Sequence, residues 1–276
     1  SSAFFSMQFG AGNTERLKKS FFLAFVLIGM ITLVLNFLVV WKLDLIIRLL
    51  QIPAEIRELI HDYLCVIFMG IIATFLYNYF ANLLRAVGNS VVSLIFLAFS
   101  AVLNIVLDLV FVLVFHWGVK GAAGATVFSQ YVSGVGILIY YYVKFPHLRV
   151  EKRHMKWDTS ILKEITGLSV LTCMQQSIMN LGILMVQGLV NSFGTAVMAA
   201  FAAAVKIDSF AYMPAQEFSN SFSIFTSQNY GAKDEKRVKE GVRAAVKTSL
   251  IHAVSSTFLI YFLYNENFLL TGHKKT

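Results

Sequence analysis

One carboxylate lies in the middle of a strongly apolar segment of the sequence. Asp108 falls within the run 91–115, VVSLIFLAFSAVLNIVLDLVFVLVF. A charge near the centre of a bilayer costs at least about 2.5 kcal/mol, so intramembrane acids usually mark an ion or substrate path. Asn104 and Ser100 precede Asp108 at helical spacing, which places the three polar groups on one helix face. The pattern predicts part of a transport protein in which Asp108 binds a proton.

Composition supports a membrane protein. The chain has 276 residues, of which 57% are hydrophobic and 14% charged, whereas soluble proteins have about 25% charged residues. The net charge of +8 does not predict a nucleic-acid partner, because most basic residues fall in the loops 10–19, 144–164 and 228–247. The positive-inside rule places these loops in the cytoplasm of an inner-membrane protein, next to anionic lipids.

Apolar segments of about 20 residues predict membrane-spanning helices, so we expect an all-α polytopic bundle. A mixed segment with Pro53, at 43–58, predicts a short interfacial helix. The predicted spans are the end of one helix at 1–9, followed by 20–42, 59–83, 91–115, 121–143, 165–191, 196–227 and 243–264.

An internal repeat predicts two lobes. The loop GAGNTERLK at 10–18 recurs as GAKDEKRVK at 231–239, and a spanning segment in the same direction follows each copy. Such a repeat implies lobes related by an axis along the membrane normal. The longest polar link, 144–164, is the expected boundary between an amino lobe, 1–143, and a partial carboxy lobe, 165–276.

These loops resemble the signatures of the multidrug and toxic compound extrusion family. The resemblance rests on QFGAGN at 8–13, RAVGNS at 85–90, NIVLD at 104–108, GVKGAAGAT at 118–126 and SQNYGA at 227–232. It implies a two-lobe transporter that exports small organic cations by proton or sodium antiport. On that template the chain is a fragment, holding the end of the second helix through the ninth and lacking the first helix and the last three.

The resemblance also implies functional residues. Asn104 and Asp108 match the family's ion site on its fifth helix, and Thr126 matches a partner on its sixth. The segment 165–191 has no acid, which disfavours a sodium site in the carboxy lobe. Polar side chains at helical spacing predict the cavity and substrate residues Asn78, Asn82, Gln130, Gln176, Asn180, Tyr212 and Gln216. Each polar stripe could instead join neighbouring helices by hydrogen bonds without a transport role.

Other functions find less support. A lipid-linked oligosaccharide flippase needs several basic cavity residues to hold a pyrophosphate, and Lys206 is the one that we place deep within a span. No zinc spacing, nucleophile motif or nucleotide loop predicts an enzyme, a catalytic residue, a metal site or a cofactor beyond the coupling ion. We expect a monomer whose partners are the bilayer and its substrates.

Overall fold

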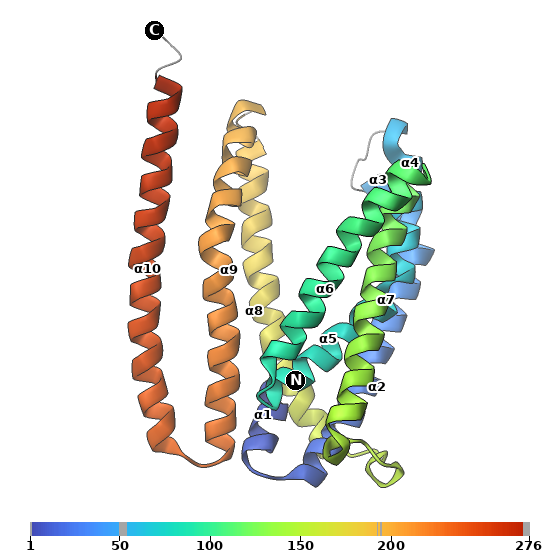
Figure 1. The fold of residues 1–276 in the computed structure, drawn as a ribbon, viewed down its shortest axis with the longest axis vertical. Coiled ribbons are helices and arrows are strands. Elements are labelled where there is room, and N and C mark those ends of the chain that lie inside the picture. The colour runs from blue at the N-terminus through green and yellow to red at the C-terminus, as the bar shows by residue number, and fades with distance from the viewer. Residues whose placement is uncertain (1, 50–53, 192, 194, 273–276) are drawn as a thin grey trace. The chain divides into compact units, whose positions relative to one another are not determined.

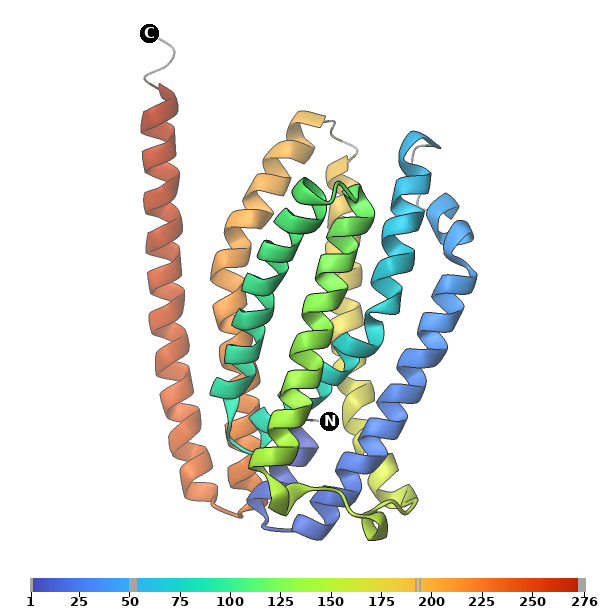
Figure 2. The same ribbon diagram turned by 45° about the vertical axis from the view of Figure 1, so that its right-hand side comes forward.

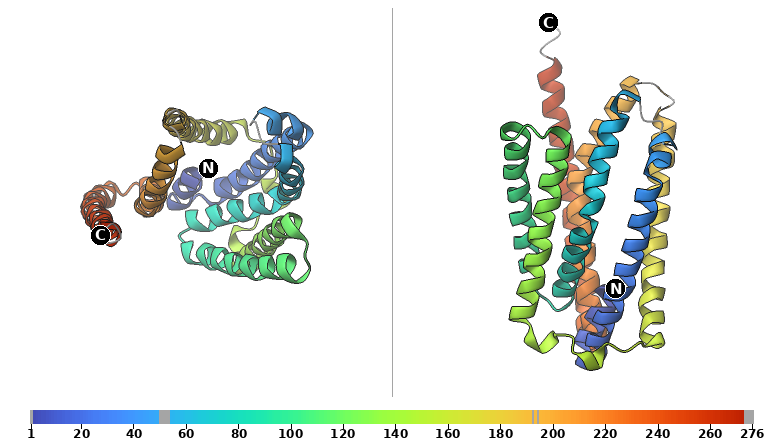
Figure 3. Two further views of the ribbon diagram at one scale, coloured as in Figure 1. Left: turned by 90° about the horizontal axis from the view of Figure 1, so that it is seen from above. Right: turned by 90° about the vertical axis from the view of Figure 1, so that its right-hand side faces the viewer.

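The computed structural model describes residues 2–49, 54–191, 193 and 195–272. Throughout these ranges the chain forms helices joined by short loops. It divides into two compact units, Ser1–Ile165 and Thr166–Thr276. Figure 1 shows the helices of each unit, and Figures 2 and 3 show them from other sides.

The amino unit is a helical bundle in which α7 packs against α4, α5 and α6. Figure 2 shows α6 and α7 (green) running side by side. A π-helical turn, Val110–Val114, extends α6. The helices are α1 (Ser2–Gly10), α2 (Thr14–Trp41), α3 (Leu43–Leu49), α4 (Ala54–Met69), α5 (Ile71–Ala86), α6 (Ser90–Leu109) and α7 (Gly118–Lys144).

The carboxy unit contains most of α8 (Thr159–Asn191), together with α9 (Thr195–Gly231) and α10 (Glu235–Gly272). The last two form a helical hairpin, orange to red in Figure 1. In the described part of the chain, α2, the extended α6, α7 and α8 are long and apolar enough to cross a membrane. The predicted spans 196–227 and 243–264 are helical as expected and lie within α9 and α10.

The two copies of the repeated loop adopt the same local structure. Gly12 and Lys233 both have positive φ, +67° and +58°. The residue that follows each one caps the next helix: the Asn13 side chain accepts a hydrogen bond from the Arg16 amide at 3.1 Å, and Asp234 accepts one from the Arg237 amide at 3.0 Å. Asn and Asp are favoured caps because their short side chains reach these unpaired amides. The two loops therefore repeat in local structure as well as in sequence.

The predicted span 59–83 is not one straight helix. It breaks at Gly70, where the axes of Arg57–Met69 and Ile71–Ala86 differ by 44°. A Cβ atom at Gly70 would lie 2.7 Å from the Val127 side chain on α7, which is a steric clash. Close packing of α7 against the bend therefore requires glycine, and apolar periodicity alone does not reveal the break. The predicted interfacial helix 43–58 includes α3 and the start of α4, while its residues 50–53 lie outside the described ranges.

The link between the two predicted lobes is folded and pinned to α2. His154 is fully buried; its Nδ1 accepts the Glu151 amide at 3.0 Å, so Nε2 carries the proton and donates to the Glu15 carboxylate at 3.0 Å. Arg16 pairs with Glu164 of α8 at 2.6 Å. The first turns of α8 therefore belong to the amino unit.

We expect His154→Ala to release this link. The change removes two hydrogen bonds, one to the Glu151 amide and one to the Glu15 carboxylate, at a cost of about 2 kcal/mol. Local opening would then make tryptic cleavage in the link roughly 30-fold faster. Limited proteolysis measures the rate, and His147→Ala is the matched control because His147 is exposed. Equal cleavage rates for the two variants would contradict the anchoring role.

Candidate functional site

Polar side chains join α6 to α7 along their whole contact. Three hydrogen bonds connect the helices in an antiparallel register: Ser133 Oγ to Phe96 O at 3.1 Å, Ser100 Oγ to Ser129 O at 3.0 Å, and Asn104 Nδ2 to Thr126 Oγ1 at 3.3 Å. The predicted pair Asn104 and Thr126 is therefore in contact. In an apolar membrane such bonds stabilise helix pairing.

Polar side chains on one face of α5 lie at the same contact between α6 and α7. The Thr74 hydroxyl donates to Gln130 Oε1 of α7, and Tyr77 donates to the Ser93 carbonyl of α6 at 3.0 Å. Asn78 Nδ2 bonds to the Thr74 carbonyl at 2.9 Å. The structure thus brings Asn78, Gln130 and the Asn104–Thr126 pair to one three-helix junction.

A cavity of about 330 Å³ occupies this junction, and we call it the polar cavity. Its walls carry hydroxyl and amide groups but no charged side chain. This volume is at the small end of ligand sites, enough for several waters or one small organic group. The lining residues are Thr74, Tyr77, Asn78, Leu97, Ser100, Ala101, Asn104, Thr126, Ser129, Gln130 and Ser133. Sequence reasoning missed Leu97 and Ala101, although they share the Ser100–Asn104 face at helical spacing.

Asp108 lies one turn beyond the lining of the polar cavity. The α6–α7 register brings this turn to the level of Ala122, so Asp108 faces the helix contact. Its Oδ1 is buried and has no hydrogen-bond partner among the described residues. A buried acceptor without a donor carries a desolvation cost. The π-helical turn starts two residues later, a feature that often occurs at functional sites and that the sequence did not predict.

Asn82 does not share this cavity. It lines a second hollow of about 330 Å³, next to Thr32 and Ile28 of α2, whereas Asn78 and Thr74 border both hollows. Asn78 and Asn82 therefore share this second hollow, and of the two Asn78 also lines the polar cavity. Along α5, Asn78 lies between the two hollows and Asn82 lies on the side that faces α2.

In the carboxy unit, the predicted residues are less closely assembled. The Tyr212 hydroxyl donates to Gln216 Oε1 at 2.8 Å and lies 3.5 Å from the Met179 sulfur on α8. Gln176 and Asn180 have exposed side chains on α8. The structure therefore brings Tyr212 and Gln216 together and leaves the two α8 amides exposed.

Comparison with known proteins places this architecture in a family. The MatE family model matches residues 1–110 and 169–276. The chain is 35% identical to the probable multidrug resistance protein YpnP of Bacillus subtilis, over 71% of this chain and 43% of that protein. It is 28% identical to the probable multidrug resistance protein YoeA of the same species, over 99% of this chain and 63% of that protein.

The fold agrees with a solved structure, a MATE protein in its bent conformation. The TM-score is 0.88 at 21% identity, over 98% of this chain and 61% of that one. The chain thus spans about half the length of the curated relatives that it matches. Both the resemblance seen in the loop signatures and the all-α membrane fold are confirmed. The chain belongs to the MatE family of multi-pass membrane transporters, which are not enzymes.

Proposed function

We propose that the complete protein exports small organic cations by antiport with a proton or sodium ion. The observation that carries this proposal is the buried, unpartnered Oδ1 of Asp108, one turn from the polar cavity. Binding a proton or a sodium ion there neutralises the carboxylate and supplies the missing partner. Asn104 and Thr126 adjust their hydrogen bonds to either state, since both can donate and accept.

Transport follows if the two conformations of the protein bind the cation differently, because a ligand shifts an equilibrium only by its differential affinity. The lobes that alternate are 1–143 and 165–276, joined by the link 144–164. Asn78, Asn82 and Gln130 line the substrate path in the amino lobe. Gln176, Asn180, Tyr212 and Gln216 contribute from the carboxy lobe.

We propose a monomer in the inner membrane with the basic loops 10–19, 144–164 and 228–247 in the cytoplasm, an orientation that the positive-inside rule supports. The coupling proton or sodium ion then enters from outside the cell, down its gradient. The lack of a charged residue on the walls of the polar cavity disfavours the flippase alternative, because a pyrophosphate needs basic partners.

Efflux of a fluorescent organic cation from proteoliposomes tests this function. The complete protein is reconstituted, and dye movement is followed under an imposed pH gradient or sodium gradient alone. One of the two gradients should drive dye against its concentration, and collapsing that gradient should stop it. Dye flux that ignores both gradients and does not saturate would indicate a passive pore and would contradict antiport.

A further inference from the structure

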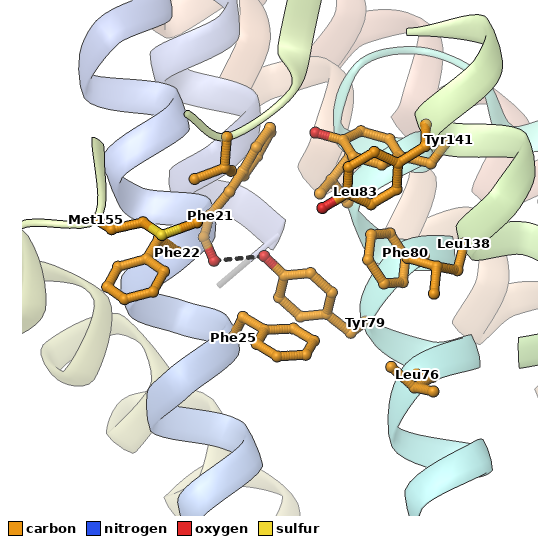
Figure 4. Close-up of a pocket in the computed structure, with 12 residues that line it drawn as sticks. Phe21, Phe22, Phe25, Leu76, Tyr79, Phe80, Leu83, Leu138, Tyr141 and Met155 are labelled. Carbon is orange, nitrogen blue, oxygen red and sulfur yellow. Dashed lines mark hydrogen bonds between the residues drawn. The ribbon is translucent and has the colours of Figure 1, made fainter. Parts of the chain in front are cut away.

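A second kind of cavity lies at the other side of the α5–α7 contact, and we call it the aromatic cavity. It has a volume of about 260 Å³ and is formed by α2, α5, α7 and the link. Figure 4 shows Phe22 and Phe25 of α2 across from Phe80 of α5, with Met155 of the link beside Phe22. The lining residues are Phe21, Phe22, Phe25, Leu76, Tyr79, Phe80, Leu83, Leu138, Tyr141, Tyr142, Val150 and Met155.

Two tyrosines of this cavity have their hydroxyls bonded to backbone carbonyls. Tyr79 donates to the Phe21 carbonyl at 2.5 Å, and Tyr141 donates to the Leu148 carbonyl at 2.6 Å. The Tyr79 ring packs edge-to-face on Phe80, with centroids 5.1 Å apart. Because these hydroxyls are already bonded, the rings present mainly carbon to the hollow. The interior therefore suits a hydrocarbon chain and offers little to a charged head group.

The edge of the cavity has the opposite character. Three exposed basic residues, Lys144, Arg149 and Lys156, lie within two positions of lining residues along the chain. We call them the basic rim. Arg149 is held there, since its Nε donates to the Tyr142 carbonyl at 2.8 Å. Of the three acids in the link, Glu151 pairs with Arg153 at 2.9 Å and with Lys18 at 3.9 Å, and Glu164 pairs with Arg16 at 2.6 Å. The third, Asp158, accepts the Ser160 and Ile161 amides at 3.1 and 3.2 Å, so the three basic residues keep the rim positive.

The link also exposes apolar side chains beside the rim. Met155 is 50% exposed and Trp157 is 62% exposed, on either side of Lys156. Tryptophan and lysine together are typical of the boundary between lipid and water. The aromatic cavity therefore opens at the level where phospholipid head groups lie.

We propose that the aromatic cavity binds an acyl chain of an anionic phospholipid whose phosphate contacts the basic rim. The apolar interior and the positive edge match the two ends of such a lipid, and basic pockets between helices commonly take phospholipid head groups. A lipophilic cation would gain from the aromatic faces but would be repelled by the rim. Because this site involves neither Asp108 nor the polar cavity, it does not depend on the transported ion.

Quenching of Trp157 by brominated lipids tests this site. The complete protein, with its other tryptophans replaced by phenylalanine, is placed in phosphatidylcholine bilayers. Small amounts of chain-brominated phosphatidylglycerol or phosphatidylcholine are then added. We expect phosphatidylglycerol to bind at least about five-fold better, the factor that one basic residue near a membrane surface provides. Size-exclusion profiles confirm that each variant is folded.

Two variants and one control separate the contribution of the cavity from that of the rim. Arg149→Gln with Lys156→Gln should remove the preference, whereas Lys239→Gln with Arg243→Gln, in α10, should keep it. Leu138→Phe with Val150→Phe fills the cavity and should weaken phosphatidylglycerol binding with the rim intact. Equal quenching by both lipids in the unchanged protein would overturn the proposal. The proposal would also be overturned if the Leu138→Phe, Val150→Phe protein kept its full preference for phosphatidylglycerol, because that preference would then reflect surface attraction alone. Displacement of the lipid by tetraphenylphosphonium would overturn it as well.

Discussion

We expect Asp108→Asn to abolish ion-coupled efflux by the complete protein while leaving its membrane insertion intact. Asparagine has nearly the shape of aspartate, so the α6–α7 contact and the Asn104–Thr126 bond at 3.3 Å should persist. Its amide neither exchanges a proton nor binds sodium as a carboxylate does. Coupled efflux should therefore fall by about two orders of magnitude, the upper range of coupling between two sites. The dye-efflux assay under the effective gradient measures the loss.

A loop acid provides the matched control for this substitution. Asp234 caps α10 through its side chain, and the equivalent position of the first repeat is Asn13, which caps α2 in the same way. Asp234→Asn should therefore keep both the fold and transport. Full coupled efflux in Asp108→Asn would show that this carboxylate is a structural group and would contradict the proposed mechanism.

We also expect Gly134→Val to disrupt the amino unit. Gly134 lies where α7 crosses α5, and a Cβ atom there would lie 2.8 Å from the Ala73 carbonyl oxygen. That atom belongs to a helix backbone and cannot move like a side-chain end, so the helices must separate. Overpacking of this kind costs about 3 kcal/mol or more. Since α5 and α7 form the walls of the polar cavity, transport should be lost with stability.

Thermal unfolding in detergent measures the stability loss, and Gly124→Ala is the control on the same helix. A Cβ atom at Gly124 would meet the Phe111 ring at an ordinary 3.9 Å, and alanine favours a helix over glycine by about 1 kcal/mol. This control should unfold at or above the temperature of the unchanged protein. A Gly134→Val protein as stable as the control would show that the crossing is looser than the structure indicates.

Local sequence signals predicted much of the amino unit. The paired loops keep their pattern because a residue with positive φ and a capping side chain are both short-range requirements, met by Gly12 and Asn13 and again by Lys233 and Asp234. Polar side chains at helical spacing on α5, α6 and α7 were expected to line a cavity. Asn78, Asn104, Thr126 and Gln130 do line one cavity. Their roles in transport remain predictions.

The limits of the polar cavity were not predictable from spacing alone. An α-helix has 3.6 residues per turn, so each step of four residues overshoots by about 40° and a step of eight by about 80°. Asn82 and Asp108 each end such a step, from Thr74 and from Ser100. This drift explains why Asn82 lines the hollow against α2, whereas Asp108 lies outside the lining of the polar cavity because it is one turn farther along α6.

Tertiary contacts determine the other features that the sequence did not reveal. The need for glycine at the bend comes from the close approach of Val127, which is distant in sequence. The link 144–164 read as polar, yet the buried His154 pins it to Glu15 of α2. A buried histidine in a charged loop has no periodic signature, because its partners come from two separate segments.

The most direct test of the account is the affinity of the complete protein for a transported organic cation, measured against pH and sodium concentration. If substrate and coupling cation oppose each other through Asp108, each must weaken binding of the other by the same factor. The account predicts that substrate affinity falls as the coupling cation is added, and that this dependence disappears in Asp108→Asn. An affinity that responds to neither cation, or that responds equally in Asp108→Asn, would contradict it.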